Sequence, residues 1–307
     1  MNVLISTSNQ MAFMFLFIIL GYVLKKNRLL PDNATAVLSK LENYIFMPCL
    51  VLNTFISRCT IQNLTTKLPF LLYSNASLLL AILLAVILTR FFATNRDEQG
   101  IYRYSFMVAN IAFMGNAIVE GVFGGEILFD YLIFTLPINL FLNSIGISWL
   151  MPSKDNKRLY QKLNNPINLS AIAGVLLGIL AIPLPQFLAS ALSAGSACMS
   201  PVAMLLTGFV IGDYQIKRLL AIKKVYLVSI YRLLIMPVLF YGLTQIIPVS
   251  ADIRHVLICA YAMPLGLNTI VIPAAYQGDT TLGASMALIS NVMALFTIPL
   301  IFFWMLT

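Results

Sequence analysis

Charge is scarce in this sequence, and so are the residue patterns of catalysis and metal binding. Only 10% of the 307 residues are Asp, Glu, Lys or Arg, whereas about a quarter of the residues of a soluble domain are charged. The single histidine and the four scattered cysteines show no metal-ligand spacing. No phosphate-binding P-loop motif occurs. These absences argue against a soluble enzyme, a metal or cofactor site and ATP-driven pumping by this chain.

Apolar residues dominate instead, at 60% of the chain. A membrane-spanning helix needs about 20 mostly apolar residues in a row. The first such run lacks a preceding basic segment and ends in Lys25-Lys26, so we expect it to remain as a spanning helix rather than act as a cleaved signal peptide. The sequence predicts an all-α polytopic membrane protein with ten transmembrane helices, at residues 7–24, 36–56, 68–92, 101–123, 127–150, 166–189, 193–212, 221–247, 253–276 and 281–306.

The longest polar stretch divides the ten expected spans into two groups of five. We therefore expect a first five-helix repeat over residues 1–152, a cytoplasmic linker over residues 153–165 and a second five-helix repeat over residues 166–307. Because five is odd, the second repeat enters the membrane from the opposite side. That arrangement is the inverted-repeat geometry of many secondary transporters.

The net charge of +8 could indicate binding to nucleic acid, but the basic residues lie in short clusters between apolar runs. Fifteen of the nineteen lysines and arginines fall in the loops of one side, and the positive-inside rule makes that side cytoplasmic. Both termini are then expected to be non-cytoplasmic, in a multi-pass protein of the cytoplasmic membrane. Nucleic acid is not an expected partner.

Two expected spans, one in each half, are interrupted by residues that do not suit a uniform apolar helix. The first reads Ala109-Asn110-Ile111-Ala112-Phe113-Met114-Gly115-Asn116-Ala117. The second reads Ala262-Met263-Pro264-Leu265-Gly266-Leu267-Asn268-Thr269, and Pro273 follows it. A broken helix survives at membrane depth only where it is buried in protein or lines a cavity. Corresponding interruptions in two halves of a membrane protein indicate a transporter's binding site.

Five short motifs occur along the chain in the same order as in a known protein family. They are Tyr44-Ile45-Phe46-Met47-Pro48, Asn110 to Gly115, Tyr261-Ala262-Met263-Pro264 with Asn268-Thr269, Tyr276-Gln277-Gly278-Asp279, and Thr297-Ile298-Pro299-Leu300. Over essentially its whole length the chain resembles the auxin efflux carrier family, which comprises the plant PIN proteins and their bacterial relatives.

The resemblance implies a scaffold and a transport domain, with the broken fourth and ninth helices crossing near the membrane midplane. It also implies an organic anion as substrate: auxin in plants, and small carboxylates such as malate or malonate in bacteria. The family usually has a proline just after the glycine of the fourth helix, near Ala117. This chain has Gly115 and Asn116 there instead. The first helix is therefore expected to be less sharply interrupted than in the family.

The polar residues of the two interruptions are the candidate substrate-binding residues. Asn110 and Asn116, with Asn268 and Thr269 in the other half, could donate hydrogen bonds to a carboxylate if the helices unwind between them. Alternatively, these side chains cap the broken backbone or bond neighbouring helices, which is a common role of intramembrane asparagine. Gly115, Pro264 and Gly266 are expected to shape the backbone around the site.

Charged side chains at membrane depth are costly and are therefore functional candidates. Arg232, in the eighth expected span, could pair with an anionic substrate or form a structural ion pair or carbonyl contact between helices. Glu120 is interpreted as the clearest buried acid and a possible proton-coupling site, with pairing to Arg232 or partial exposure as the alternatives. Lys40 and Glu42 lie near the end of a span and are expected to reach the membrane interface.

These features favour a secondary transporter that moves a small organic anion, a carboxylate or dicarboxylate such as malate or malonate or an auxin-like acid, by alternating access and in the direction of efflux. A sodium-coupled importer of the bile-acid symporter type and a non-transporting membrane sensor on the same fold are the alternatives. No enzymatic activity, cofactor or metal is expected. Membrane lipid is the expected surrounding, and a homodimer is left open.

Overall fold

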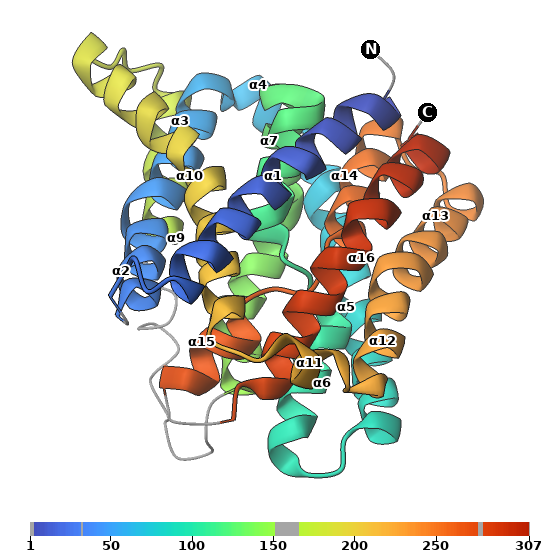
Figure 1. Ribbon diagram of the computed structural model, residues 1–307. Helices are drawn as coiled ribbons and strands as arrows, with labels where there is room; N and C mark the ends of the chain where they lie inside the picture. The colour runs from blue at the N-terminus through green and yellow to red at the C-terminus, as the bar shows by residue number, and fades with distance from the viewer. Residues whose placement is uncertain (1–2, 32, 151–165, 276–278, 307) are drawn as a thin grey trace.

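The computed structural model describes residues 3–31, 33–150, 166–275 and 279–306. Within these ranges the chain forms helices and no strand, which confirms the all-α prediction. The expected linker at residues 153–165, the expected end of the first repeat at residue 152 and the motif residues Tyr276-Gln277-Gly278 lie outside the described residues. In Figure 1 the first turn of α1 and the last turn of α16 lie at the same end of the helical bundle.

The described elements include five-residue π-helical turns, labelled η. In chain order the elements are α1 (Val3–Lys26), α2 (Ala34–Leu41), η1 (Glu42–Phe46), α3 (Met47–Arg58), α4 (Ile61–Thr66), α5 (Leu68–Phe92), α6 (Arg96–Met107), η2 (Ile111–Gly115), α7 (Asn116–Phe141), η3 (Leu142–Gly146), α9 (Pro166–Ile179), α10 (Gln186–Gly212), α11 (Ile216–Leu220), α12 (Lys223–Ile230), η4 (Tyr231–Ile235), α13 (Met236–Ile246), α14 (Ala251–Ala262), α15 (Asn268–Ala275) and α16 (Thr281–Leu306).

Helices occupy each of the ten ranges in which spans were expected, but they are not divided as the sequence suggested. Seven helical stretches among the described residues are long and apolar enough to cross a membrane, and α9 is a shorter apolar helix. One of the seven, Glu98–Gly146, joins the expected fourth and fifth spans. Gly124 bends it with a φ of +82°, a left-handed conformation that suits glycine. The ninth expected span is split into α14 and α15, so ten crossings remain a prediction.

Two spans widen into a π-helical turn immediately before a Met-Pro pair. η1 leads into Met47-Pro48, and η4 leads into Met236-Pro237. Proline has no N–H to donate, and its ring crowds the carbonyl of the fourth residue before it. The regular helical ladder is interrupted there, and an extra residue is accommodated in the preceding turn. Each of these turns contains one buried charged residue, Glu42 in η1 and Arg232 in η4.

Helices α1 and α10 make the most extensive contact between any two helices described. Two glycines allow their backbones to approach closely. A Cβ atom placed on Gly21 would overlap the carbonyl oxygen of Leu205, and one placed on Gly208 would overlap the carbonyl oxygen of Ile18. Close packing of small residues stabilises helix pairs in lipid, where burial of apolar surface gives little advantage. We refer to this contact as the α1–α10 seam.

We expect Gly208→Ala to lower the Tm of the purified protein in detergent, because the added methyl group forces the two backbones of the α1–α10 seam apart. Overpacking of this kind costs about 1–3 kcal/mol. Gly242→Ala is the matched control, since a Cβ there would meet no atom within 4 Å and alanine is favoured over glycine in a helix by about 1 kcal/mol. Equal Tm values for the two variants would contradict close packing at the seam.

Candidate functional site at the crossing of two interrupted helices

The first interruption lies between α6 and η2. Helix α6 ends at Met107, and residues 108–110 are not helical. The helix restarts because Asn110 caps it: its side-chain Oδ1 accepts a hydrogen bond from the backbone N–H of Phe113 at 3.3 Å. Asparagine is a favoured cap because its short side chain satisfies an N–H that has no partner within the helix. Asn110 therefore has the capping role that was one of its two predicted alternatives.

The second interruption lies between α14 and α15. Helix α14 ends at Ala262, residues 263–267 are not helical, and Pro264 lies in the middle of the break. The backbone N–H of Leu265 donates to the hydroxyl of Ser290 in α16 at 3.0 Å. The hydroxyl of Thr269 donates to the carbonyl of Gly266 at 3.2 Å. Neighbouring side chains thus replace hydrogen bonds that the broken helix has lost.

The two interruptions meet and bond to each other. The backbone N–H of Asn110 donates to the carbonyl oxygen of Pro264 at 2.7 Å. A Cβ placed on Gly266 would lie 3.5 Å from the Cα of Asn110, an ordinary van der Waals distance, so Gly266 lies close to Asn110. The amide of Asn268, at the start of α15, donates to the hydroxyl of Tyr104 in α6 at 2.7 Å. We call this meeting of the two unwound segments the crossing.

Asn116 is the least engaged of the predicted polar side chains. It is 3% exposed, its Nδ2 donates to the sulfur of Met47 at 3.5 Å, and its Oδ1 has no hydrogen-bond partner. Thioether sulfur is a weak acceptor. The Nδ2 donor of Asn116 is thus only weakly engaged, and it is this donor rather than the Oδ1 acceptor that could bind a carboxylate. Among the predicted contact residues, Asn116 is therefore the one whose hydrogen-bonding capacity is most available to a substrate.

Gly115 makes room for a tyrosine that sequence reasoning missed. A Cβ at this position would overlap the hydroxyl of Tyr131, which donates to the carbonyl of Ile111 at 3.0 Å. The tyrosine is fully buried and belongs to α7. Its hydroxyl supports η2, the first turn after the break. No local sequence pattern links Tyr131 to the interruption. The two lie in the same long helical stretch and come into contact only because that stretch bends at Gly124.

Arg232 contacts the end of the first half-helix rather than an acid. It is 1% exposed, and its Nη1 donates to the carbonyl of Met107, the last residue of α6, at 3.2 Å. The guanidinium also lies 5.2 Å from the centre of the Tyr261 ring. A cation at the C-terminal end of a helix is favourable, because the last carbonyls there carry partial negative charge. These contacts are those of a structural clamp between η4 and the crossing.

The observed exposure of two acidic side chains, Glu120 and Glu42, differs from what the sequence predicted. Glu120 is exposed, so it is not the clearest buried acid, although its proposed role in proton coupling remains a prediction. Glu42 is 0% exposed, so it does not reach the interface, whereas Lys40 is exposed as expected.

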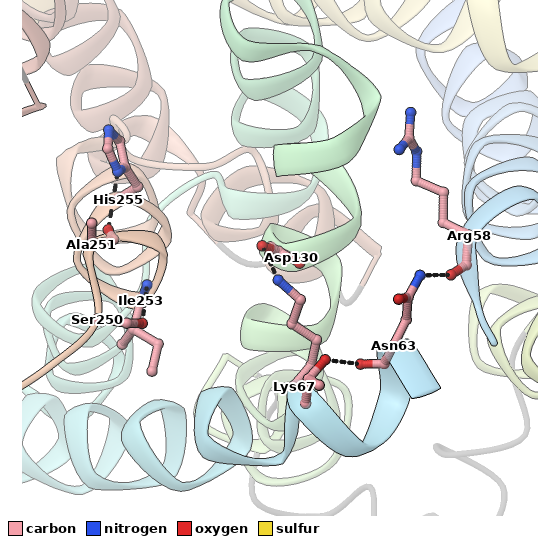
Figure 2. Close-up of polar contacts among 9 residues, drawn as sticks. Arg58, Asn63, Lys67, Asp130, Ser250, Ala251, Ile253 and His255 are labelled. Carbon is pink, nitrogen blue, oxygen red and sulfur yellow. Dashed lines mark hydrogen bonds and ion pairs between the residues drawn. The ribbon is translucent and has the colours of Figure 1, made fainter. Parts of the chain in front are cut away.

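Asp130 is a second buried acid that the sequence did not reveal. Figure 2 shows Lys67, at the junction of α4 and α5, pointing to Asp130 in α7, and the Nζ–Oδ2 distance is 2.6 Å. Asp130 is 63 residues away from Lys67 in sequence, so the pair could be recognised only in the fold. It ties the α4–α5 junction to α7, at some remove from the crossing.

We expect Arg232→Met to lower the Tm, because the carbonyl of Met107 then loses a charge-assisted hydrogen bond worth about 1.5–3 kcal/mol. The matched control is Arg90→Met, which removes an exposed arginine from the last turn of α5 and should leave the Tm unchanged. Thermal unfolding in detergent measures both. An unchanged Tm for Arg232→Met, together with weaker anion binding, would instead assign Arg232 to the substrate.

Comparison with known proteins places this architecture in a family. The model of the membrane transport protein family matches the chain twice in succession, at residues 6–164 and 153–302. An uncharacterized transporter of Methanocaldococcus jannaschii, MJ1031, is 23% identical over 296 residues, which cover 93% of this chain and 94% of that protein. The chain therefore belongs to the membrane transport protein family, and its resemblance to the auxin efflux carriers is confirmed.

Proposed function

We propose that this protein is a secondary transporter that moves a small organic anion across the cytoplasmic membrane by alternating access. The observation that carries the proposal is the hydrogen bond from the Asn110 N–H to the Pro264 carbonyl at 2.7 Å. It joins two helix breaks that the sequence places in opposite halves of the chain. Family membership supports the general activity, and the substrate and mechanism are inferred from the crossing.

The chemistry of the crossing suits a carboxylate. Two helices, η2 with α7 and then α15, begin at the breaks, and the first N–H groups of a helix carry partial positive charge. The amide of Asn268 and the hydroxyl of Thr269 lie in the first turn of α15, and the amide of Asn116 follows the first turn, η2, after the other break. Donors of this kind stabilise a bound anion, although none of them carries a full positive charge. A monocarboxylate or a dicarboxylate such as malate or malonate meets these requirements.

Admission of a substrate requires the crossing to open, because Asn110, Asn116 and Thr269 are all buried. In alternating access, one group of helices moves against the rest, and a fixed central site faces each side of the membrane in turn. We assign the fourth and ninth helices of the ten-span arrangement to the transport machinery and place their crossing near the midplane.

The tandem matches of the family model support two inverted five-helix repeats. The common location of the first turn of α1 and the last turn of α16 is consistent with an even number of crossings (Figure 1). The excess of basic residues in alternate loops then puts both termini on the non-cytoplasmic side. For a monoanion, a membrane potential of 100 mV, negative inside, favours exit by about 2.3 kcal/mol, so efflux is the proposed direction in the absence of a coupled ion.

We expect Asn116→Ala to weaken anion binding about 10- to 100-fold, because one hydrogen bond to a charged group contributes about 1.5–3 kcal/mol. Malonate, malate and indole-3-acetate are titrated against the purified protein by calorimetry. Exchange of the same radiolabelled anions is then measured in proteoliposomes.

Asn75→Ala is the matched control for this test. Asn75 is exposed in α5, and its Nδ2 donates to the Leu71 carbonyl of its own helix at 2.7 Å. This variant should bind and exchange anions like the wild type. If Asn116→Ala and Asn75→Ala bind with equal affinity while the wild type binds, the crossing is not the anion site.

A further inference from the structure

A buried acid one π-helical turn before Met47, which contacts Asn116, has no role in the proposed site. Glu42, the first residue of η1, is 0% exposed, and neither Oε1 nor Oε2 has a hydrogen-bond partner. The other buried acid among the described residues, Asp130, is paired with Lys67. Burial of an unpaired carboxylate costs several kcal/mol, and such a group takes up a proton instead. In this arrangement the stable form of Glu42 is the neutral acid.

No charge of opposite sign compensates Glu42 within the described part of the chain. The elements that pack most extensively against η1 are α2, α3, α9 and α10. Helix α9 carries no titratable side chain, and α10 carries only the exposed Cys198. The basic residues of α2 and α3 are Lys40, which is exposed, and Arg58, which lies beside Gly125 in α7. The remaining titratable groups of α3 are the thiols Cys49 and Cys59.

The free carboxyl oxygens suit a proton, because neither Oε1 nor Oε2 of Glu42 is engaged in a hydrogen bond. A proton needs a single carboxyl oxygen. The site is also enclosed, so the proton can exchange with water only when the helices around η1 rearrange.

Glu42 is connected to the crossing through one residue. The backbone N–H of Met47 donates to the carbonyl of Glu42 across the π-helical turn, and the sulfur of Met47 accepts from the amide of Asn116 at 3.5 Å. Helix α10 packs against both η1 and η2. A rearrangement that admits an anion beside Asn116 therefore also disturbs the packing around Glu42.

We propose that Glu42 carries the proton that couples this transporter to a pH gradient. The carboxylate binds one proton from water when its surroundings are hydrated, and the neutral acid is buried when the crossing closes. Protonation removes a negative charge close to the anion site, so proton and anion bind together more readily than either binds alone. The inference rests on the proposed function, and it makes the transported complex one charge more positive than the anion alone.

The protonation state is tested without a substrate. The infrared difference spectrum of wild type minus Glu42→Gln at pH 7 should contain the carbonyl stretch of a protonated carboxylic acid, shifted in D2O. The Tm of the wild type should fall more than that of Glu42→Gln as the pH rises, because ionisation of the buried acid favours the unfolded chain. Glutamine resembles the neutral acid in shape, so Glu42→Gln is expected to fold. Absence of the band, together with parallel Tm profiles, overturns the proposal.

Coupling is tested in proteoliposomes to which radiolabelled malonate is added outside, with indole-3-acetate as the second probe. An imposed pH gradient should drive accumulation by the wild type and by Glu126→Gln, which alters an exposed glutamate of α7. Glu42→Gln should still exchange anion at equal pH but should not respond to the gradient. A gradient response that Glu42→Gln retains and Glu120→Gln loses assigns coupling to Glu120 and overturns the proposal. Dependence on sodium in place of protons also overturns it.

The two proposals fail in different ways. If the wild type neither binds nor exchanges malonate, malate or indole-3-acetate, the organic-anion function fails, and the coupling role fails with it whatever the infrared spectrum shows. If the wild type exchanges an anion with equal rates in the presence and absence of a pH gradient, the transporter stands and only the role of Glu42 is overturned.

Discussion

The structure depends on the requirement that every backbone N–H and C=O at membrane depth has a partner. Two helices of this chain lose helical hydrogen bonds where they are interrupted. The freed backbone groups bond instead to the other interrupted segment or to a neighbouring side chain. The Asn110 N–H bonds to Pro264, the Leu265 N–H to Ser290, and the Met107 carbonyl to Arg232. The crossing is therefore not a flexible gap in two helices. It is a cross-linked unit of main-chain bonds, held in place by a few polar side chains.

The buried charges differ in how they are compensated, and this difference separates structural from functional candidates. Asp130 is paired with Lys67, and Arg232 contacts a helix end and an aromatic ring. Each of these two charges has a partner at one of its polar atoms, although Asp130 Oδ1 and Arg232 Nε are left without a hydrogen bond. Glu42 has neither kind of partner. A buried carboxylate in this situation is stable when it binds a proton, and this is the basis for the proposal that Glu42 couples transport to a pH gradient.

Sequence reasoning located the breaks but not the side chains around them. Proline, glycine and asparagine in an apolar run have direct consequences for the helical ladder, so the interruptions near Asn110 and Pro264 were predictable. The side chains that satisfy the breaks were not, because Tyr104, Tyr131 and Ser290 come from elsewhere in the chain. The burial of Glu42 was missed because a regular helix was assumed. An extra residue per turn at η1 changes the face on which a side chain lies.

The α1–α10 seam restricts which movements the molecule can make. Its glycines bring backbone against backbone, so sliding α1 along α10 would drive carbonyl oxygens into Cα atoms. Helix α1 belongs to the first half of the chain and α10 to the second, and the two must travel as one body. In the proposed alternating-access movement, the boundary between moving and stationary parts would therefore not coincide with the boundary between the two halves of the sequence.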